Sequence, residues 1–360
     1  MIAVLGAGHA GRALAADLAR RGAEVRLWNR TPDHVAEIAA VGGIKLEGEV
    51  GGFGRLDLVT SVMGEALDGA DIAMVCVPAC AHRDVAATCA PHLADGQSVV
   101  LNPGRTFGAL EFLHELSLRG CEADVTVAEA ATFIFASRTS GPAQSRIMRI
   151  KHAVPIAAVP NERTPAVAAA LAPWYPQFTA APSTLDTSFG NVGAVVHPAI
   201  TLLNTARIEN TQGRFDFYID GVSPGVANLL EAVDRERIAV ASLLGVSVRS
   251  IKEWLESAYR AIGASLHEAI QANEGYRGIL APPSLDNRYI FEDVPFSLVP
   301  MASAGASVGL QPRAIEAVVD LAGLVYDTNF WARGRTLASL GLGGLSPGEI
   351  QRVAAEGFPR

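Results

Sequence analysis

Three side chains in the second half of the chain have the types needed for acid–base chemistry on a carboxylate-bearing substrate. His197 lies in the apolar stretch NVGAVVHPAITLLN, and histidine exchanges protons near neutral pH. Asp293 could hold one nitrogen of such a ring, and Arg288 could bind a carboxylate through two parallel hydrogen bonds. On these residues alone, a hydrogen-bonded core histidine and a surface loop with ordinary ion pairs remain the simpler interpretations.

Near the start of the chain, IAVLGAGHAG has the spacing Gly6-x-Gly8-x-x-Gly11 between an apolar strand pattern and a helical one. In dinucleotide-binding folds the first glycine permits a tight turn and the second lets a pyrophosphate approach the backbone. The third lets the helix pack closely on the strand, and the helix N-terminus binds the phosphates. We expect cofactor contacts from Gly6, Gly8, His9, Ala10 and Gly11, with His9 contributing its backbone.

The end of the second expected strand, EVRLWNR, indicates which dinucleotide is bound. NAD-selective sites usually carry Asp or Glu there for the ribose hydroxyls, whereas this chain has Asn29, Arg30 and Thr31. A cation in this position suits a 2′-phosphate, so we expect NADP(H) in preference to NAD(H). Thr31 followed by Pro32 is also typical of a helix start, which is the alternative role for Thr31.

Two further segments are expected at the carboxyl ends of strands, where open α/β sheets bind their ligands. Val77 and Pro78 follow one apolar run, and Asn102 follows another. We expect these residues to contact the nicotinamide half of the cofactor, although turn chemistry alone also explains residues of these types.

Two kinds of architecture must position these groups. Up to about residue 150, short β-rich runs alternate with helical patterns, which is typical of a mostly parallel sheet covered by helices. From about Ser188 long helical patterns take over. We predict an α/β protein with a Rossmann-type, doubly wound parallel sheet in residues 1–184 and an all-helical second domain in residues 185–360. Strands are expected at Ile2–Leu5, Glu24–Trp28, Leu56–Thr60, Ile72–Val77, Ser98–Leu101, Val125–Glu129, Ile147–Lys151 and Val154–Val159, and later helices at Pro224–Leu244, Ser250–Ala272 and Pro312–Leu324.

Composition excludes several classes of protein. The 360 residues carry 29 Lys+Arg and 37 Asp+Glu, a formal net charge of −8, which disfavours nucleic acid and anionic membranes as partners. We find no secretory signal and no apolar run of the ~20 residues that span a bilayer. The four cysteines lack paired spacing and the histidines form no metal-binding cluster, so we expect reduced, mostly buried thiols, a cytoplasmic location and no metal.

Over essentially its full length the chain resembles the opine dehydrogenases of the octopine/nopaline dehydrogenase family, and most of all the bacterial N-(1-carboxyethyl)-amino-acid dehydrogenases. The similarity is carried by GAGHAG at the start, LNPGRTFGALEF, NVGAVVHPAITLLN, YIDGVSPGVANLLEAVDRERIAVA, DNRYIFEDVPFSLVP and DTNFWARGRTLASLGL. The resemblance implies NAD(P)H-dependent reductive condensation of an α-keto acid with the amino group of an amino acid. It also implies a homodimer.

The family's catalytic histidine falls on His197, its partner aspartate on Asp293 and its carboxylate-binding arginine on Arg288. Asn204 and Thr132 are weaker candidates for substrate contacts, and both are equally well explained as helix or turn structure. The residues that select the amino acid are poorly marked. The segment 212–220 is a candidate for lining that pocket by placement only.

Two alternatives belong to other classes. A ketopantoate-reductase-like or 3-hydroxyacid dehydrogenase shares the glycine motif and a helical second domain, but typically relies on a lysine in that domain. Lys252 is the only lysine after Lys151, which disfavours this interpretation. A non-catalytic NADP(H)-binding protein would need the glycine loop but not His197, Arg288 and Asp293 together.

Overall fold

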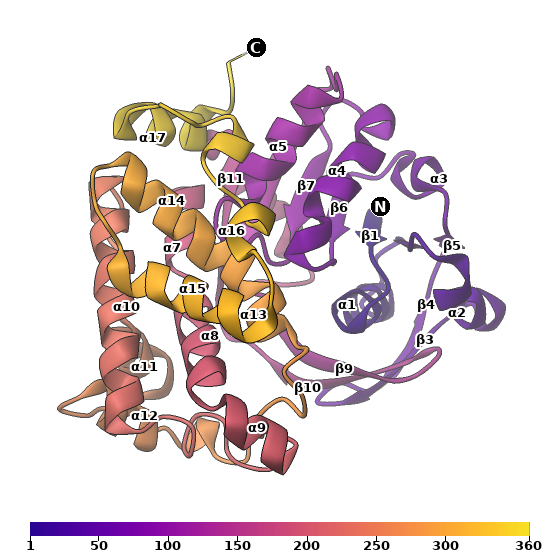
Figure 1. Cartoon of the computed structure of the whole chain (residues 1–360). Helices are drawn as coiled ribbons and strands as arrows, with labels where there is room; N and C mark the ends of the chain where they lie inside the picture. Colours follow the sequence, from indigo (N-terminus) through magenta and orange to yellow (C-terminus); the bar gives the residue numbers. More distant parts are fainter. Residues whose placement is uncertain (360) are drawn as a thin grey trace. The chain divides into compact units, whose positions relative to one another are not determined.

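A computed structural model describes residues 1–359 (Figure 1). The chain divides into two compact units, one formed by Met1–Thr187 together with the residues from Arg352 on, and the other by Ser188–Gln351. The predicted second domain extended to the end of the chain, and this differs from the structure. The last segment packs with the first unit, where Thr184 donates a hydrogen bond to the carbonyl of Ala354.

The first unit is built on an eight-stranded sheet in the order β12-β11-β8-β7-β6-β1-β2-β5. Neighbouring strands are parallel except β8 and β11, which are antiparallel. The chain runs from β1 outward through β2, then returns to β6 on the other side, so the strand order reverses between β1 and β6. The doubly wound Rossmann-type prediction is therefore confirmed. The strands are β1 Ile2–Leu5, β2 Val25–Trp28, β5 Leu58–Thr60, β6 Ile72–Val75, β7 Ser98–Leu101, β8 Thr126–Ala130, β11 Val154–Val159 and β12 Phe178–Ala180.

Apolar side chains on these strands and on the helices form the core of the unit. Val4, Leu27, Met74 and Val100 are fully buried, and Leu14 of α1 packs against the same cluster. The helices and 3-10 turns are α1 His9–Arg20, η1 Pro32–His34, α2 Ala36–Val41, α3 Met63–Leu67, η2 Ala79–Ala81, α4 His82–Cys89, η3 Ala90–His92, α5 Gly108–Leu118, η4 Asn161–Arg163, α6 Thr164–Leu171 and α7 Thr184–Phe189.

A second sheet of four strands, in the order β4-β3-β10-β9, was not predicted. The run Ile147–Lys151 was assigned to the main sheet, but it lies here, in β10, beside β3 and β9. Gly54 of β4 comes so close to the backbone of Ala16 in α1 that a Cβ would lie 2.2 Å from its carbonyl oxygen. The strands are β3 Gly43–Gly48, β4 Gly52–Arg55, β9 Phe135–Gly141 and β10 Gln144–Ile150.

The second unit is helical, as predicted, with a single isolated β-bridge between Asp216 and Leu280 among its described residues. Ser250–Ala272 was expected to be one helix, but it forms two. Arg260 ends the first of them with a left-handed φ of 56°. The helices are α8 Gly193–Leu203, α9 Thr205–Thr211, α10 Pro224–Leu243, α11 Ile251–Tyr259, α12 Leu266–Gln271, η5 Glu274–Tyr276, α13 Arg288–Phe291, η6 Val294–Leu298, α14 Val299–Ser307, α15 Arg313–Tyr326, α16 Phe330–Arg333 and η7 Ala338–Leu340. The last helix, α17 Pro347–Glu356, begins in this unit and ends in the first.

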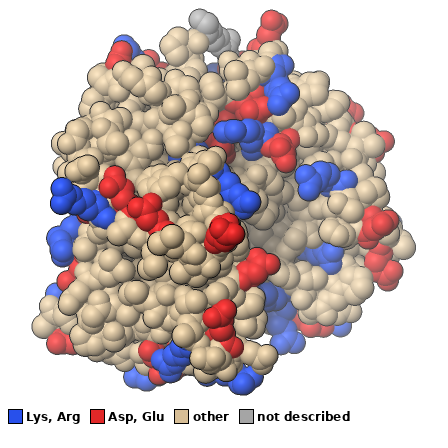
Figure 2. All heavy atoms as spheres, in the orientation of Figure 1, with Lys and Arg blue, Asp and Glu red and all other residues tan. Residues whose placement is uncertain are grey.

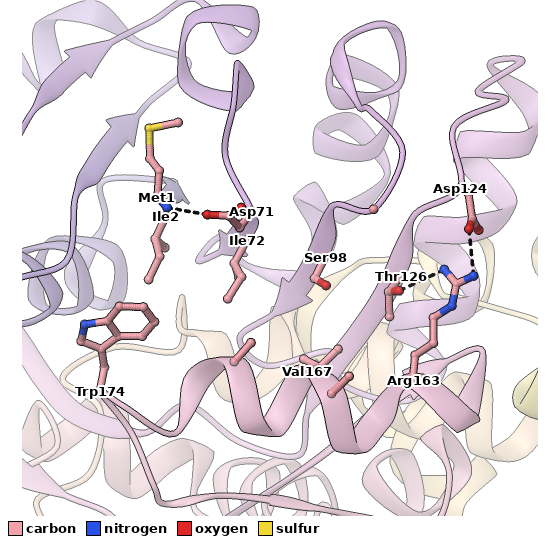
Figure 3. A pocket seen from close by; sticks show the side chains of 13 residues that line it. Met1, Ile2, Asp71, Ile72, Ser98, Asp124, Thr126, Arg163, Val167 and Trp174 are labelled. Atoms are coloured by element: carbon pink, nitrogen blue, oxygen red, sulfur yellow. Dashed lines mark hydrogen bonds and ion pairs between the residues drawn. The ribbon is translucent and has the colours of Figure 1, made fainter.

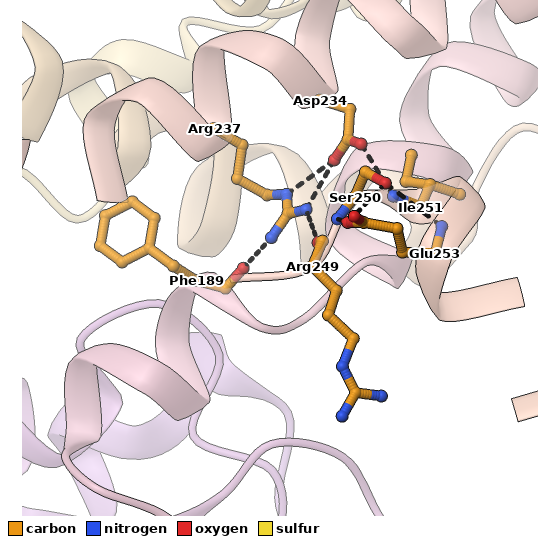
Figure 4. A network of polar contacts seen from close by, with 7 residues as sticks. All are labelled: Phe189, Asp234, Arg237, Arg249, Ser250, Ile251 and Glu253. Carbon is orange, nitrogen blue, oxygen red and sulfur yellow. Dashed lines mark hydrogen bonds and ion pairs between the residues drawn. The ribbon is translucent and has the colours of Figure 1, made fainter. Parts of the chain in front are cut away.

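A buried arginine joins three segments of the helical unit (Figure 4). Arg237 of α10 is fully buried and binds Asp234 through Nε and Nη2, at 2.9 and 2.7 Å. It also donates to the carbonyls of Phe189 and Arg249. Asp234 in turn accepts the amide of Ile251 at the start of α11, 2.8 Å away. The guanidinium and carboxylate thus satisfy each other and anchor the entry to α11.

Replacing Arg237 with methionine should destabilise the helical unit by about 3–5 kcal/mol, because it leaves a buried carboxylate without its cation. The matched control is Arg277→Met, since Arg277 forms an exposed pair with Glu274 and its loss should change stability by less than about 1 kcal/mol. Thermal and denaturant unfolding of both variants measures the difference. Equal stability of the two variants would contradict this account of the network.

Candidate active site

The segments predicted to bind the cofactor lie at one edge of the large sheet. Because β2, β1, β6 and β7 are parallel and in register, the residues that follow them share this edge. Backbone hydrogen bonds extend the ladder there, from Gly6 to Trp28 at 2.8 Å and from Asn102 to Val75 at 2.9 Å. The structure thus brings together the glycine loop, the segment after β2, Val77 and Asn102.

The glycine loop leaves open space where a pyrophosphate would approach the backbone. Gly6 has a φ of 110°, and a Cβ there would lie 2.7 Å from the side chain of Val77. A Cβ on Gly11 would lie 1.7 Å from the carbonyl oxygen of Gly6, so the close helix–strand contact requires glycine. A Cβ on Gly8, by contrast, would meet nothing within 4 Å. Gly8 also precedes α1 without any side-chain cap, which leaves the helix N-terminus available to an anion.

The loop is held by groups that the sequence analysis did not assign. Arg12 of α1 donates from Nε to the carbonyl of Ala7 at 2.7 Å and from its terminal nitrogens to Gly141, Pro142 and His34. Burial of the guanidinium lowers the pKa of Arg12 from its ordinary value. Arg12 therefore ties the glycine loop to the β9–β10 turn and to η1. Its pattern, a lone arginine after the third glycine, gives no local indication of these distant partners.

Two of the residues predicted to contact the cofactor have protein partners for their side chains. Asn29 accepts the amide of Ala7 through Oδ1 at 3.0 Å and donates to the carbonyl of Thr31 at 3.0 Å. The ring of His9 accepts the backbone amide of Thr139 through Nδ1, at 2.9 Å. The side chains of both residues thus shape the loop, and Nδ1 of His9 is engaged by Thr139.

Arg30 and Thr31 are exposed beyond the end of β2. The Arg30 side chain is 78% exposed, and its nearest carboxylate is that of Asp84 at 3.7 Å. Thr31 does precede a turn of helix, as the alternative interpretation required, but its hydroxyl makes no capping hydrogen bond. Both side chains are therefore accessible to a phosphate.

Asn102 has an oxygen that lacks a protein partner. The residue is only 2% exposed, and its Nδ2 donates to the carbonyl of Val100 at 2.8 Å. Within residues 1–359 its buried Oδ1 accepts no hydrogen bond. A buried acceptor without a donor is costly, so the site fits a ligand that brings a hydroxyl or amide N–H. Together with the space over Gly8, this geometry fits a dinucleotide cofactor.

A buried carboxylate that the sequence analysis missed supports the segment after Asn102. Glu129 of β8 is fully buried. It accepts the amide of Ala109 at 2.8 Å and the hydroxyl of Thr187 at 2.6 Å. A Cβ on Gly104 would lie 2.5 Å from this carboxylate, so the loop needs glycine there to pass over Glu129.

Thr132, a weaker candidate for substrate contacts, has a protein partner, and a cavity of the first unit lies away from the proposed cofactor edge. The hydroxyl of Thr132 accepts a hydrogen bond from Lys151 Nζ at 2.5 Å. A cavity of about 610 Å³ lies at the opposite, amino ends of the strands (Figure 3). Its charged groups pair with one another, Met1 with Asp71 and Arg163 with Asp124. It is therefore not the cofactor site.

In the helical unit the structure brings His197 and Asp293 together. His197 Nδ1 of α8 lies 2.9 Å from Oδ2 of Asp293, which precedes the π-helical turn η6. Asp293 is fully buried, whereas the His197 side chain is 17% exposed. Gly193, one turn earlier in α8, makes room for the ring, since a Cβ there would lie 3.1 Å from His197 Cε1. A buried carboxylate facing a histidine fixes the ring with Nδ1 as donor and stabilises its protonated form.

Aromatic rings surround the histidine. Tyr289 stacks on His197 with centroids 4.2 Å apart and an interplanar angle of 20°. The hydroxyl of Tyr218 lies 3.1 Å from His197 Nε2, and Tyr218 itself stacks on Tyr276 at 4.0 Å. Phe217 contacts both His197 and Tyr289. The aromatic run FDFY within 212–220 was the only indication in the sequence, and it did not single out Tyr218.

Arg288 is exposed and its guanidinium lies 5.9 Å from the centroid of the Tyr289 ring, beside the histidine. Among residues 1–359 no carboxylate forms an ion pair with it, so it remains available for a substrate carboxylate. Asn204 has structural partners, because its Nδ2 donates to the carbonyls of Ile200 and Gly221, each at 2.9 Å.

Some kinds of site are not seen in the described part of the chain. Residues 1–359 contain no group of three potential metal-ligating side chains, and none of their helices has the length and apolarity needed to cross a bilayer. Acidic and basic side chains are interspersed over the face drawn in Figure 2.

Comparison with known proteins identifies two matching domains. The alpha-helical domain of NAD/NADP octopine/nopaline dehydrogenases matches residues 180–326, and the ketopantoate reductase PanE/ApbA family matches residues 2–141. The second match covers only the dinucleotide-binding part that both predicted dehydrogenase classes share. It is the helical match that distinguishes them.

Relatives extend the similarity over the whole chain. An opine dehydrogenase from Arthrobacter sp. (strain 1C) is 40% identical over 350 residues, covering 97% of each chain. The protein ocs of Agrobacterium vitis is 27% identical and covers 98% of each chain. Among solved structures, octopine dehydrogenase in complex with NADH and agmatine has a TM-score of 0.83 at 20% identity, covering 100% of this chain and 98% of that one. Yersinopine dehydrogenase bound to NADP+ has a TM-score of 0.74 at 16% identity, covering 98% and 97%.

The two structural likenesses show the fold, and the identity to the Arthrobacter enzyme over nearly the full length of both chains shows the family. The chain therefore belongs to the opine dehydrogenases, NAD(P)-dependent oxidoreductases that join the amino group of an amino acid to an α-keto acid by reductive condensation.

Proposed function

We propose that His197 and Asp293 are the acid–base pair of this reaction and that Arg288 binds a carboxylate of the substrate. The observation that carries the proposal is the 2.9 Å contact between His197 Nδ1 and the fully buried Asp293 carboxylate. An exposed arginine next to a ring stacked on that histidine adds the group needed to orient a keto acid.

The residues of the helical unit transfer protons and orient the substrate. Arg288 pairs with the carboxylate of the keto acid and fixes its carbonyl relative to His197. His197 accepts a proton from the amino acid's ammonium group, and Asp293 stabilises the resulting imidazolium. The same proton then goes to the oxygen that leaves as water when the imine forms. Bound NAD(P)H supplies the hydride that reduces the imine carbon and gives the secondary amine.

Replacing His197 with alanine should lower kcat by about 10²–10⁴-fold, because the reaction loses its proton carrier. The dissociation constant of the cofactor should stay within about threefold, since the glycine loop is untouched. His152, an exposed histidine, provides the control, and His152→Ala should leave both constants unchanged. Steady-state kinetics and cofactor titration measure these values. Turnover within a few-fold of the wild type in His197→Ala would refute the assignment.

We further propose that the chain prefers NADPH to NADH. Support comes from the absence of an acidic residue at the three positions directly after β2 and from the exposure of Arg30 and Thr31, which suits a 2′-phosphate.

Arg30→Ala should raise the KM for NADPH by about 10–100-fold and leave that for NADH almost unchanged, because one charge-assisted phosphate contact is lost. Asp84→Ala is the matched control, since it removes the carboxylate near Arg30 and should maintain or improve the use of NADPH. KM values for both cofactors measured in parallel test this. A similar increase in KM for NADH and NADPH would show that Arg30 does not bind the 2′-phosphate.

The glycine loop allows ligand binding to be separated from folding. Gly8→Ala should weaken cofactor binding by at least about tenfold while thermal stability is retained, because the added methyl group fills only the ligand's space. Gly11→Ala should instead destabilise the protein by forcing β1 and α1 apart. Gly348→Ala, in open space in α17, should do neither. Normal cofactor binding by folded Gly8→Ala would contradict the placement of the pyrophosphate.

An oxidation assay of NADPH and NADH with pyruvate across a panel of amino acids tests the function as a whole. Oxidation that requires both the keto acid and the amine supports the proposal. Oxidation with a keto acid alone would favour the ketopantoate-reductase-like alternative. That alternative typically relies on a lysine in the second domain, and Lys252 of the helical unit donates a hydrogen bond to the carbonyl of Ala264. Tight NADPH binding without oxidation in any combination would favour a non-catalytic protein.

A cytoplasmic location and a homodimer complete the proposal. The described cysteines are all free thiols, although only Cys76 and Cys89 are buried. Leu324 of α15 is 83% exposed, with Val325 and Trp331 also more than a third exposed, and such side chains suit a subunit interface. Light scattering of the purified protein measures its oligomeric state.

A further inference from the structure

Both ring nitrogens of His197 have partners in this structure. Nδ1 faces Asp293 at 2.9 Å, and Nε2 faces the hydroxyl of Tyr218 at 3.1 Å. If Asp293 holds Nδ1, as the proposed function requires, only Nε2 can exchange a proton with the substrate. Tyr218 occupies that position, so it must either move away or carry the proton itself.

The surroundings of Tyr218 hold it in place. Its ring is stacked on Tyr276 with centroids 4.0 Å apart and an interplanar angle of 15°. Phe217 meets the same ring edge-on at 5.1 Å. The residue is 8% exposed, so its phenol is fixed by rings on two sides while a small part of its surface remains accessible. Swinging the phenol away from His197 would break this stack.

A neutral phenol has the chemistry for a relay. Its oxygen accepts one hydrogen bond while its O–H donates another. Burial raises the pKa of Tyr218 well above its usual range, so the hydroxyl keeps its proton between transfers. The charge of Arg288 lowers the pKa of Tyr218, and this effect is smaller than the increase caused by burial.

We propose that Tyr218 is a catalytic residue that transfers protons between the substrate and His197. The inference rests on the proposed roles of His197 and Asp293. In the first transfer an N–H of the substrate's ammonium group gives its proton to Tyr218 Oη, and Tyr218 gives its own proton to His197 Nε2. The amine then attacks the keto carbon, and one of its N–H protons passes to the new alkoxide oxygen, which gives the neutral carbinolamine.

In the second transfer the proton returns. His197 Nε2–H gives its proton to Tyr218 Oη, and the Tyr218 O–H gives its proton to the carbinolamine oxygen. The C–O bond breaks, and water leaves together with the protonated imine that hydride then reduces. Ammonium and ketone are thereby converted to protonated imine and water with no net proton gained or lost by the protein, and both Tyr218 and His197 recover their starting states.

Tyr218→Phe removes only the hydroxyl and retains the stacked ring. We expect kcat to fall by about 30–300-fold, with KM for both substrates within about threefold. The solvent deuterium isotope effect on kcat should increase, because proton transfer becomes rate-limiting. Tyr326→Phe is the matched control. Its hydroxyl is buried, makes no hydrogen bond within residues 1–359 and lies on α15, so its loss should leave the kinetics unchanged.

A second variant avoids any doubt about folding. Incorporating 3-fluorotyrosine at position 218 keeps size and stacking but makes the phenol more acidic, and a relay predicts that kcat changes by about threefold or more. An unchanged kcat in this protein, or a kcat within about threefold of wild type in Tyr218→Phe, would overturn the relay. So would a loss of kcat whose isotope effect stays at the wild-type value.

His197→Ala measured in the same series separates the two hypotheses. An inactive His197→Ala beside an active Tyr218→Phe refutes only the relay. An active His197→Ala refutes the acid–base pair on which the relay depends.

Discussion

The buried carboxylate of Asp293 imposes the constraint on which the helical unit's site depends. A carboxylate with no exposure is stable only if protein donors satisfy it, and His197 Nδ1 lies within hydrogen-bonding distance. This contact determines which nitrogen of the ring is available for chemistry. The remaining arrangements follow from it: Gly193 leaves room for the ring, Tyr289 stacks on its face, and Tyr218 meets its other nitrogen.

The two units have different proposed roles, cofactor binding in the first and proton transfer in the second. We propose that the first unit binds the dinucleotide mainly with backbone, through the open space over Gly8 and the helix N-terminus, and that the unpartnered oxygen of Asn102 accepts a donor on the ligand. The second unit carries the proposed proton-transfer groups. The dinucleotide cofactor and the α-keto acid are both anions, although the chain has a net charge of −8. We therefore propose that recognition relies on two individual cations, Arg30 and Arg288, rather than on a basic surface.

Short patterns in the sequence predicted the features that depend on residues close together in the chain. β1, β7 and β11 begin and end where their apolar runs do, and the glycine spacing identified the loop because Gly6 and Gly11 have no room for a side chain and Gly8 leaves open space over the backbone. His197 and Asp293 lie far apart in the sequence, and it was the family resemblance that paired them. The second sheet was missed because β9 and β10 are largely polar. Arg12, Glu129 and Tyr218 were missed because their partners are distant in the chain and leave no local pattern.

The central claim, that His197 and Asp293 act as one unit, is tested most directly by a double-mutant cycle on kcat. It combines His197→Ala with Asp293→Asn, which keeps the shape of the buried side chain. If the aspartate works only through the histidine, the double variant should be no slower than the slower single variant. Losses of activity that multiply in the double variant would show that the two residues act independently and would contradict this account.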